Sequence, residues 1–412
     1  MVQISAFRGL RPDPAIAAEL VSVPYDVVDR EEARAMAADR AACFLRIVRS
    51  DLEFPDEQDA YANLIYERAR ENLEKFRKNG WLLREESESL YVYRLNMGSH
   101  QQTGLVAGSA IEDYRTDKIK KHEFTRPDKE KDRTRHIDVL GANTGPVFLL
   151  YNSASDPKIA ATLDGFADAS TPLYDLSFDD GVRHRLYRIA PDRPEFTQLL
   201  AAFQALPATY IADGHHRAAS AFTNGQKRIA DGRGDGPHQF FLSVIFPDNQ
   251  LRILPYNRVV QDLNGLSVDG FLAKVRDRFD LSSGARAPGA RSWNMYLDGQ
   301  WYHMQARDSM YANADEIGAL AVSVLQKELL QPTLAIEDPR TSERIAFVGG
   351  IRGDKELERL VNSGRFAVAF SMPPVTPQEL TRVADAGKVM PPKSTWFEPK
   401  LRSGFVVHLL DE

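Results

Sequence analysis

A strand, a glycine turn and a helix follow one another within residues 206–221. Residues 206–211, Leu-Pro-Ala-Thr-Tyr-Ile, predict a buried strand, and an alanine-rich helical stretch comes after it. Gly214 permits the sharp turn between the two elements, and we expect Asp213 to cap the helix. The first free N–H groups of that helix then belong to His215, His216 and Arg217. The pattern predicts a strand-to-helix junction that binds an anion.

Phosphate is the anion that best matches this junction. Unpaired backbone donors and the planar, permanently charged guanidinium of Arg217 would point at one place. A histidine beside them can donate to a phosphate oxygen or move a proton. The alternative is a junction whose histidines only cap the helix and bond locally. The run His215-His216-Arg217 at a helix start favours the phosphate site over that alternative.

Composition narrows the class of protein. A length of 412 residues and a hydrophobic content of 43% are ordinary for a globular protein of two or three domains. A net charge of -6 argues against a general nucleic-acid binder, whose surface is broadly basic.

Cys43 stands alone, which excludes an internal disulfide, and its apolar neighbours indicate a buried side chain. No apolar run approaches the ~20 residues that a bilayer requires, and residues 1–8 do not resemble a signal peptide, so we expect a cytoplasmic protein.

The order of predicted elements is irregular and contains several hairpins, which indicates mixed sheets and the α+β class. A capping box at residues 29–32 starts a helix that extends to residue 40. Further elements are expected as a strand at 44–48, a helix at 60–78, a hairpin of 91–95 with 104–107, strands at 147–151 and 185–189, a helix at 194–206, hairpins of 240–246 with 251–254 and of 294–297 with 301–304, and a helix capped by Thr376. A composition shift at residues 152–171 suggests two α+β lobes, 1–170 and 171–412.

Residues 118–136 form a polar, largely basic segment. If Thr125 caps a helix with Pro127 in its first turn, Lys129, Arg133 and His136 share one stripe that can grip a polyphosphate. By spacing alone, a solvated helix of alternating charge is the more common outcome. The adjacent pair His122-Glu123 adds an acid and a base, and a glutamate here can accept a hydroxyl proton during phosphoryl transfer.

A stiff segment, residues 387–400, lies near the C-terminus. It contains Lys393, Ser394 and Thr395, but Pro391-Pro392 stands where a P-loop has glycines, so a P-loop is excluded. The loop either lines a site or packs against an edge. No cluster of histidine and cysteine has zinc-ligand spacing.

Five motifs together resemble a known family. The resemblance spans nearly the whole chain and rests on Val23-Pro24-Tyr25-Asp26-Val27-Val28, Lys121-His122-Glu123, Asp132-Arg133-Thr134-Arg135-His136, Ala212-Asp213-Gly214-His215-His216-Arg217-Ala218-Ala219 and Met390-Pro391-Pro392-Lys393-Ser394-Thr395-Trp396-Phe397. This is the bacterial and archaeal domain-of-unknown-function family number one-thousand-fifteen, which is similar to the ParB and sulfiredoxin superfamily in its Gly-His-x-Arg element. Members of that superfamily bind or cleave nucleotides with a Gly-x-x-Arg phosphate cradle at a helix start. The resemblance implies a ParB/sulfiredoxin-like core with an additional α+β lobe.

Residues 213–218 also resemble the Asp-Gly-His-Thr-Arg-Ala motif of free-serine kinases, with His216 in place of threonine. That likeness implies a phosphotransferase acting on a small hydroxylated metabolite, with free L-serine as the first candidate, Mg²⁺ as cofactor and ATP, ADP or pyrophosphate as donor. The expected catalytic residues are Glu123, Asp213 and His215. The expected phosphate-binding residues are His216, Arg217, Arg133, Arg135, His136, Lys393, Ser394 and Thr395. The expected substrate-binding residues are Tyr25, Asp26 and His122, and no metal ligand is assigned.

Two other functions remain open at this point. A nucleotide-binding regulator can use the same cradle without turnover, and a ParB-like phosphodiesterase or nuclease can use it for cleavage. The acidic charge balance counts against long nucleic-acid substrates. The sequence leaves the oligomeric state open.

Overall fold

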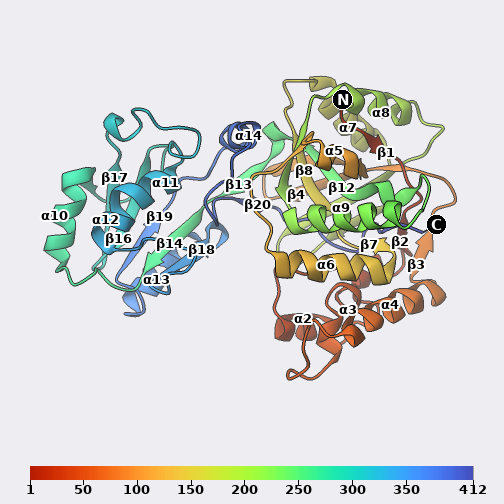
Figure 1. The fold of residues 1–412 in the computed structure, drawn as a ribbon, viewed down its shortest axis with the longest axis horizontal. Coiled ribbons are helices and arrows are strands. Elements are labelled where there is room, and N and C mark those ends of the chain that lie inside the picture. Colours follow the sequence, from red (N-terminus) through yellow and green to blue (C-terminus); the bar gives the residue numbers. More distant parts are fainter. Residues whose placement is uncertain (412) are drawn as a thin grey trace. The chain divides into compact units, whose positions relative to one another are not determined.

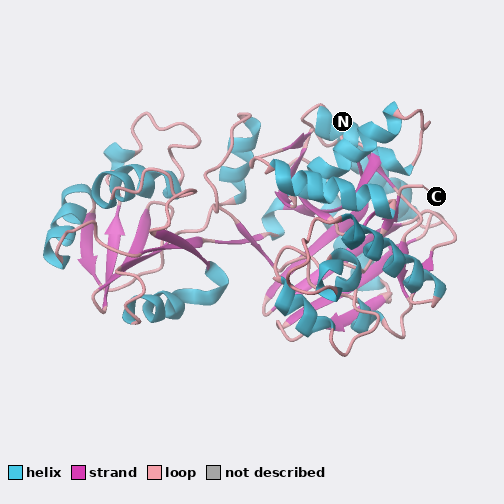
Figure 2. Cartoon of the chain, turned by 60° about the horizontal axis from the view of Figure 1, so that its bottom comes forward, coloured by secondary structure: helices cyan, strands magenta, loops and turns pink. Residues whose placement is uncertain are grey.

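The computed structural model describes residues 1–411 of the chain. Its contacts divide the protein into two compact units (Figure 1). The first consists of Met1–Leu251 together with the C-terminal segment Pro399–Glu412, and the second is Arg252–Glu398. Each unit combines helices with a sheet of its own (Figure 2). No helix among the described residues is both long and apolar enough to cross a membrane.

The first unit is built on a nine-stranded sheet with the order β6-β11-β8-β12-β5-β4-β10-β9, and β1 pairs with β5 beside this path. Its strands are β1 (Ile4–Ser5), β4 (Leu90–Met97), β5 (His100–Ala110), β6 (Ile119–Lys120), β8 (Val147–Tyr151), β9 (Tyr174–Ser177), β10 (Val182–Ile189), β11 (Thr209–Asp213) and β12 (Phe240–Pro247). β12 with β8 and β11 with β6 are parallel pairs, whereas the other pairs are antiparallel. The sheet is mixed, so the predicted α+β class is confirmed.

The hairpin predicted around Gly98 is present. β4 and β5 pair from Tyr91 with Val106 to Met97 with His100. Gly98 has a φ of +60°, a left-handed backbone conformation that glycine adopts without steric cost. The long strand β5 then continues to Ala110 as a central strand of the sheet.

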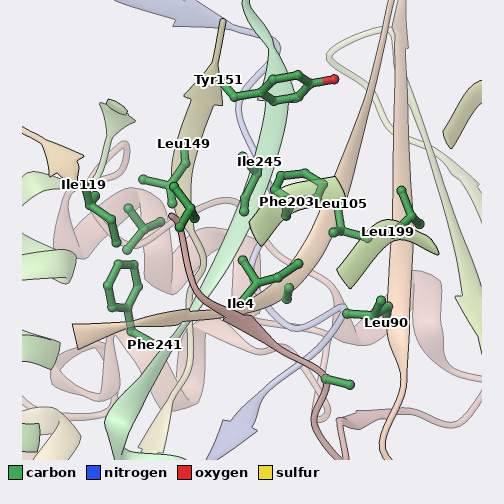
Figure 3. Packing of buried hydrophobic residues seen from close by; sticks show 14 of the residues in the cluster. Ile4, Leu90, Leu105, Ile119, Leu149, Tyr151, Leu199, Phe203, Phe241 and Ile245 are labelled. Carbon is green, nitrogen blue, oxygen red and sulfur yellow. The ribbon is translucent and has the colours of Figure 1, made fainter. Parts of the chain in front are cut away.

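Five helices accompany this sheet, and their apolar side chains meet those of the strands in one core. They are α5 (Ile111–Arg115), α6 (Pro127–Leu140), α7 (Pro157–Ala169), α8 (Pro194–Ala205) and α9 (His215–Ala230). Figure 3 shows Phe203 near the strand residues Leu105 and Ile245, all of them fully buried. Burial of such side chains stabilises each by about 1.5–3 kcal/mol relative to exposure. Helices α6 and α9 contact each other along their length (Figure 1).

The remaining elements of the first unit are α1 (Ala17–Leu20), α2 (Arg30–Ala37), α3 (Leu45–Val48) and α4 (Asn63–Lys78), with the strand pairs β2 (Leu10–Pro12) and β3 (Leu82–Arg84), and β7 (Ala142–Asn143) and β21 (His408–Leu409). Helices α2 to α4 share a second core in which Cys43 is fully buried, as expected. The predicted capping box is confirmed, because Asp29 and Glu32 exchange both of its hydrogen bonds at the start of α2.

The strand predicted at residues 44–48 is wrong, because these residues form the helical turn α3. Periodicity cannot distinguish a buried strand from a buried helical turn in an apolar run of five residues. Here Leu45, Ile47 and Val48 are buried in the second core, and α3 packs against α4. Tertiary packing decides the local conformation.

Residues 152–171, where the composition shift suggested a lobe boundary, lie inside the first unit. They include α7, whose Ile159, Leu163 and Phe166 are buried in the main core. Their alanine-rich composition therefore belongs to an amphipathic helix. The contacts place the division of the chain at Leu251 and Pro399 instead.

The second unit contains an antiparallel sheet with the order β15-β17-β16-β19-β14-β18. Its strands are β14 (Tyr256–Val260), β15 (Asp280–Ser283), β16 (Ser292–Leu297), β17 (Gln300–Gln305), β18 (Ile345–Gly349) and β19 (Val368–Ser371), and β13 (Arg252–Leu254) pairs with β20 (Trp396–Glu398). Its helices are α10 (Val268–Arg278), α11 (Ala321–Leu325), α12 (Gln331–Leu334), α13 (Gly353–Asn362) and α14 (Pro377–Asp385).

Two of the predictions for this unit are confirmed, whereas the predicted hairpin of its first strand, β13, with β12 of the first unit is not. β16 and β17 form the expected hairpin, and Thr376 and Glu379 form the capping box of α14. The predicted hairpin of 240–246 with 251–254 is wrong. β12 pairs with β5 and β8 on its two sides, which leaves no free edge for β13.

Candidate functional site

The strand-to-helix junction around Gly214, which we call the elbow, has the predicted course. β11 ends at Asp213, Gly214 turns the chain with a φ of +94°, and α9 begins at His215. A Cβ atom at position 214 would lie 3.1 Å from Nε and 3.2 Å from Cζ of Arg217. The left-handed backbone favours glycine here, and a Cβ atom would also crowd the guanidinium of Arg217.

Asp213 does not cap α9, contrary to the sequence prediction. The helix has Gly214 at its N-cap and no side-chain cap. The Oδ2 atom of Asp213 instead lies 3.2 Å from Nζ of Lys400, which comes from the C-terminal segment of the same unit. Burial raises the pKa of Asp213, but Lys400 and Arg217 outweigh burial and hold this pKa well below its usual range.

The start of α9 consequently retains unused donors. The N–H of Ala218 donates to the Gly214 carbonyl at 3.0 Å, as the helix requires. Within residues 1–411 no acceptor is found for the N–H groups of His215, His216 and Arg217. Three backbone donors and the positive end of the helix dipole therefore remain available to an anion.

Arg217 is the charged member of the site. Its Nη1 donates to the Pro146 carbonyl, and its Nη2 lies 3.4 Å from Oδ2 of Asp26. Its Nε is buried and has no hydrogen-bond partner in the described part of the chain. Burial lowers the pKa of Arg217, but Asp26 and Asp213 raise it by more, so the guanidinium is always charged.

Four predicted residues line one cavity of about 30 Å³, namely Tyr25, Arg133, His136 and Arg217. A space of this size holds one or two water molecules. The other polar walls come from residues that sequence reasoning did not select, including Asn143, Thr144 and Ser403. These residues come from β7, the loop after it and the C-terminal segment.

Tyr25 and Arg133 form one wall of this cavity. The guanidinium carbon of Arg133 lies 4.4 Å from the centroid of the Tyr25 ring, a cation–π contact. Arg133 also pairs with Asp132 at 2.8 Å, and Asp132 accepts a hydrogen bond from the Tyr66 hydroxyl at 2.7 Å. Burial and then Asp26 raise the pKa of Tyr25 to about 12, so its hydroxyl remains a hydrogen-bond donor at neutral pH.

His215 joins the site to Glu123. Its Nε2 accepts a hydrogen bond from the backbone N–H of His122 at 3.5 Å, and its Nδ1 lies 3.6 Å from Oε2 of Glu123. Burial lowers the pKa of His215 well below the usual value, so the ring is neutral and carries its proton on Nδ1. That proton points to the Glu123 carboxylate, which is 55% exposed.

The rings of His122 and His216 lie in different hydrogen-bonding surroundings. The His122 ring stands perpendicular to that of His215 with centroids 4.5 Å apart, and its buried Nδ1 has no partner among the described residues. Burial lowers the pKa of His122 to about 4. His216 accepts the N–H of Arg126 at Nε2, 3.0 Å away, and its lowered pKa, caused mainly by burial, leaves a neutral ring with the proton on Nδ1.

The predicted phosphate-binding residues of α6 lie in two surroundings, and Lys129 of the predicted stripe donates to the Tyr61 hydroxyl at 2.8 Å. Arg133 and His136 line the cavity, and Nε2 of His136 lies 3.1 Å from the Ile47 carbonyl oxygen. Arg135 lies over the Tyr66 ring at 5.3 Å and lines a different pocket with Thr125 and Thr223. The predicted cap is also wrong, because Arg126 holds the N-cap position and Thr125 donates to Glu130.

Lys393, Ser394 and Thr395 belong to the second unit. The Ser394 hydroxyl donates to the Pro391 carbonyl at 2.6 Å, which closes the turn. The carbonyl of Lys393, whose φ is +54°, accepts a hydrogen bond from Arg258 at 3.3 Å. These contacts stabilise the loop within its own unit.

Lys400 is the charged partner that sequence reasoning missed. It is the last residue of the segment 387–400 and lies outside the run Lys393-Ser394-Thr395 that was selected there, and 187 positions separate it from Asp213. Only the return of the C-terminal segment to the first unit brings the two together. Within residues 1–411 no three His, Cys, Asp or Glu side chains are grouped to hold a metal ion.

Comparison with solved structures finds distant similarities. A free serine kinase in complex with AMP shares 12% identity and a TM-score of 0.33, covering 71% of this chain and 86% of that one. A conserved hypothetical protein from Pyrococcus furiosus shares 14% identity and a TM-score of 0.33, covering 74% and 95%. SbnI with C-terminal truncation from Staphylococcus aureus shares 12% identity and a TM-score of 0.38, covering 74% and 87%.

No curated protein matches the sequence. A family model described as "Protein of unknown function (DUF1015)" matches residues 4–329, which is most of the chain and includes the elbow. This confirms the resemblance carried by the motifs around Tyr25, Glu123 and Arg217. The chain belongs to the family of proteins of unknown function DUF1015.

Proposed function

We propose that the first unit is a phosphotransferase that binds a phosphoryl donor at the start of α9 and transfers its phosphoryl group to a small hydroxylated metabolite. The observation that carries this proposal is Arg217, whose buried Nε has no partner in the described chain beside three free backbone N–H groups. Burying a donor without a partner costs about 1–3 kcal/mol. A hydrogen bond from Nε of Arg217 to a phosphate oxygen would remove that cost.

Each hydrogen-bond donor around Arg217 has a role in phosphate binding. Arg217 and the N–H groups of α9 bind the oxygens of the transferred group, as helix starts and guanidinium groups do. His216 adds its Nδ1–H, and the Tyr25 hydroxyl adds a donor from the cavity wall. Because Asp26 lies 3.4 Å from Arg217, its carboxylate occupies the anion position beside the guanidinium until a phosphoryl donor binds.

Glu123 is the general base in this proposal. It accepts the proton of the substrate hydroxyl as that oxygen attacks phosphorus, and the bond from phosphorus to the leaving oxygen of the donor breaks. His215 is a positioning residue, because its Nδ1–H points to Glu123 and its Nε2 is already occupied by the His122 N–H. This contact orients the Glu123 carboxylate.

Mg²⁺ is the expected cofactor. It keeps several water ligands and binds through one or two carboxylates and the substrate phosphates, so no all-protein cluster is required. Asp26 and Asp213 are the carboxylates of this site that would hold it, and the ion would neutralise charge on the phosphates. Lys400 keeps Asp213 ionised for this purpose.

The acceptor that we propose first is free L-serine, because residues 213–218 resemble the motif of free-serine kinases. ATP, ADP and pyrophosphate are the candidate donors. A regulator that binds nucleotide without turnover is the second candidate. It is favoured by the existing pairing of Arg217 with Asp26 and of Lys400 with Asp213, which makes a stable site without substrate.

Phosphorus NMR of the purified full chain tests the proposal. The protein is incubated with Mg²⁺, L-serine and one donor at a time, and the spectrum identifies any product. A phosphoserine resonance that grows with time supports transfer and names the donor. Shifted or broadened donor resonances without a product support the regulator, and unchanged spectra with every donor contradict both.

A further inference from the structure

Arg258, on β14 of the second unit, is a buried cation without an acidic partner. Arg258 is 5% exposed, and no carboxylate within residues 1–411 forms an ion pair with it. Its Nη1 donates to the Tyr256 carbonyl and its Nη2 to that of Lys393. Two neutral carbonyls engage at most part of the five N–H donors and leave the charge unbalanced. Burial alone lowers the pKa of Arg258 to about 10.

Arg258 lines a pocket of about 210 Å³ that lies entirely within the second unit. Apolar side chains form much of its wall, including Val322, Leu330 and Pro391. Its polar lining includes Ser323 and Gln326, both on the helix that begins with α11. A mostly apolar pocket with a few convergent polar groups is typical of small-molecule sites.

Two of these polar atoms are buried without a partner in the described chain, Oγ of Ser323 and Oε1 of Gln326. The orientation of the Gln326 amide is fixed, because its Nε2 donates to the Ile336 carbonyl at 2.6 Å. Its Oε1 is therefore an acceptor in need of a donor. Ser323 can donate to an anion or accept from a cation.

The helix widens at this pocket. After α11 the chain forms a π-helical turn, Gln326–Leu330, and Pro332 follows in the next turn. Proline lacks the N–H that would continue the regular helix. Such wide turns are frequent at functional sites, where they redirect side chains.

Asp338 also lines the pocket, but its charge is already balanced. Both of its carboxylate oxygens lie within 3.0 Å of the Arg340 guanidinium, and that pair holds the pKa of Asp338 below its usual value. The pocket thus presents one unbalanced cation, one free hydroxyl and one free acceptor.

We propose that this pocket binds a free α-amino acid with an aliphatic side chain. The ligand carboxylate would lie against Arg258 and the Ser323 hydroxyl, and its ammonium group would donate to Oε1 of Gln326. The side chain would contact Val322 and Leu330. A phosphate dianion fits less well, because it requires more donors than one guanidinium and one hydroxyl and leaves Gln326 without a donor. This site is separate from the elbow and does not depend on the proposed phosphotransfer.

Isothermal titration of the full chain with L-valine tests this proposal. N-acetyl-L-valine and L-valinamide serve as probes that lack the ammonium or the carboxylate charge, and inorganic phosphate is titrated separately. We expect saturable binding of one valine per chain and at least tenfold weaker binding of both derivatives. Absence of valine binding, or tighter binding of phosphate than of valine, would overturn the proposal.

Variants locate the site. Arg258→Met should weaken valine binding more than tenfold and Ser323→Ala about three- to tenfold, a loss equal to one hydrogen bond of about 1 kcal/mol. Arg359→Met, an exposed arginine of α13 in the same unit, is the matched control and should bind as the unchanged protein does. If Arg258→Met does not fold, Ser323→Ala and Gln326→Leu decide the outcome. Unchanged affinity in both would contradict the proposal.

Arg217→Met separates this inference from the proposed function. The variant should lose binding of the phosphoryl donor at the elbow and keep valine binding in the second unit. Loss of both ligands would show that the amino acid binds at the elbow, which would overturn the assignment to Arg258 and leave the phosphotransferase proposal standing.

Discussion

The side chain of Lys400 lies 3.2 Å from the Asp213 carboxylate at the end of β11. This pair anchors the C-terminal segment on the elbow and keeps Asp213 ionised next to Arg217. The elbow therefore depends on a residue of the C-terminal segment. It follows that changes at Lys400 should affect both the stability and the chemistry of the site.

Lys400→Met should destabilise the first unit by about 1 kcal/mol at pH 7, since Asp213 loses its nearest cation while remaining partly solvated. The folded-state pKa of Asp213 is depressed, so the stabilisation is present above the unfolded value near 3.8 and is lost as pH falls through the folded value. Urea unfolding at pH 7 and pH 3 measures the difference between the two proteins, which should shrink in acid. An equal difference at both pH values would argue against an electrostatic role.

Gly214→Ala should weaken binding of the phosphoryl donor, because the new Cβ would lie 3.1 Å from Nε of Arg217 and would push its guanidinium aside by a few tenths of an ångström. The left-handed backbone adds a cost of about 1–2 kcal/mol in stability. Gly80→Ala is the matched control, since Gly80 has a φ of +72° and no atom within 4 Å of its Cβ position. The control should lose similar stability in urea unfolding and keep donor binding. Equal binding by both variants would mean that Arg217 does not need its present position.

Glu123→Gln should leave donor affinity within twofold and lower the transfer rate about 10²- to 10⁴-fold, which is the usual contribution of a general base. Rates and affinities are measured by phosphorus NMR and titration calorimetry. His215→Gln should lower the rate less and shift its pH profile, because His215 only orients the carboxylate. A Glu123→Gln variant with the full rate would place the base elsewhere.

The buried histidines should make the first unit sensitive to mild acid. Burial lowers the pKa of both His122 and His136 to about 4, against 6.5 when unfolded. The unfolded chain therefore binds more protons below pH 6.5, and each ring contributes stability of on the order of 3 kcal/mol that is lost as pH falls from 6.5 towards 4. Hydrogen exchange of peptides from β8 and β12 at pH 7 and pH 5 measures this loss. His136→Gln should flatten the pH dependence, and unchanged protection at pH 5 would contradict the assignment.

Local patterns predicted much of the fold. The β4–β5 hairpin, the two capping boxes and the glycine elbow were all predictable, because each depends on residues close in sequence. The turn of α3 was not, because an apolar run of five residues suits either conformation until its packing is known.

The candidate site was predictable in part for the same reason. The triplet His215-His216-Arg217 follows from the elbow, Glu123 and Arg133 follow from the pattern of residues 118–136, and Tyr25 was selected by resemblance. Lys400 and Arg258 were missed, because their importance comes from a distant carboxylate in one case and from the lack of one in the other. The residues next to Lys400 and Arg258 in the sequence do not indicate either property.

Titration of ATP, ADP and pyrophosphate into the unchanged protein and its Arg217→Met variant tests the central claim most directly. Arg183→Met, an exposed arginine on β10 of the same unit, is the control for loss of a surface charge. We predict that the unchanged protein and the control bind at least one donor with equal affinity and that Arg217→Met binds it at least 100-fold more weakly. Equal affinity of Arg217→Met for every donor, or no binding by the unchanged protein, would contradict a phosphate site at the start of α9.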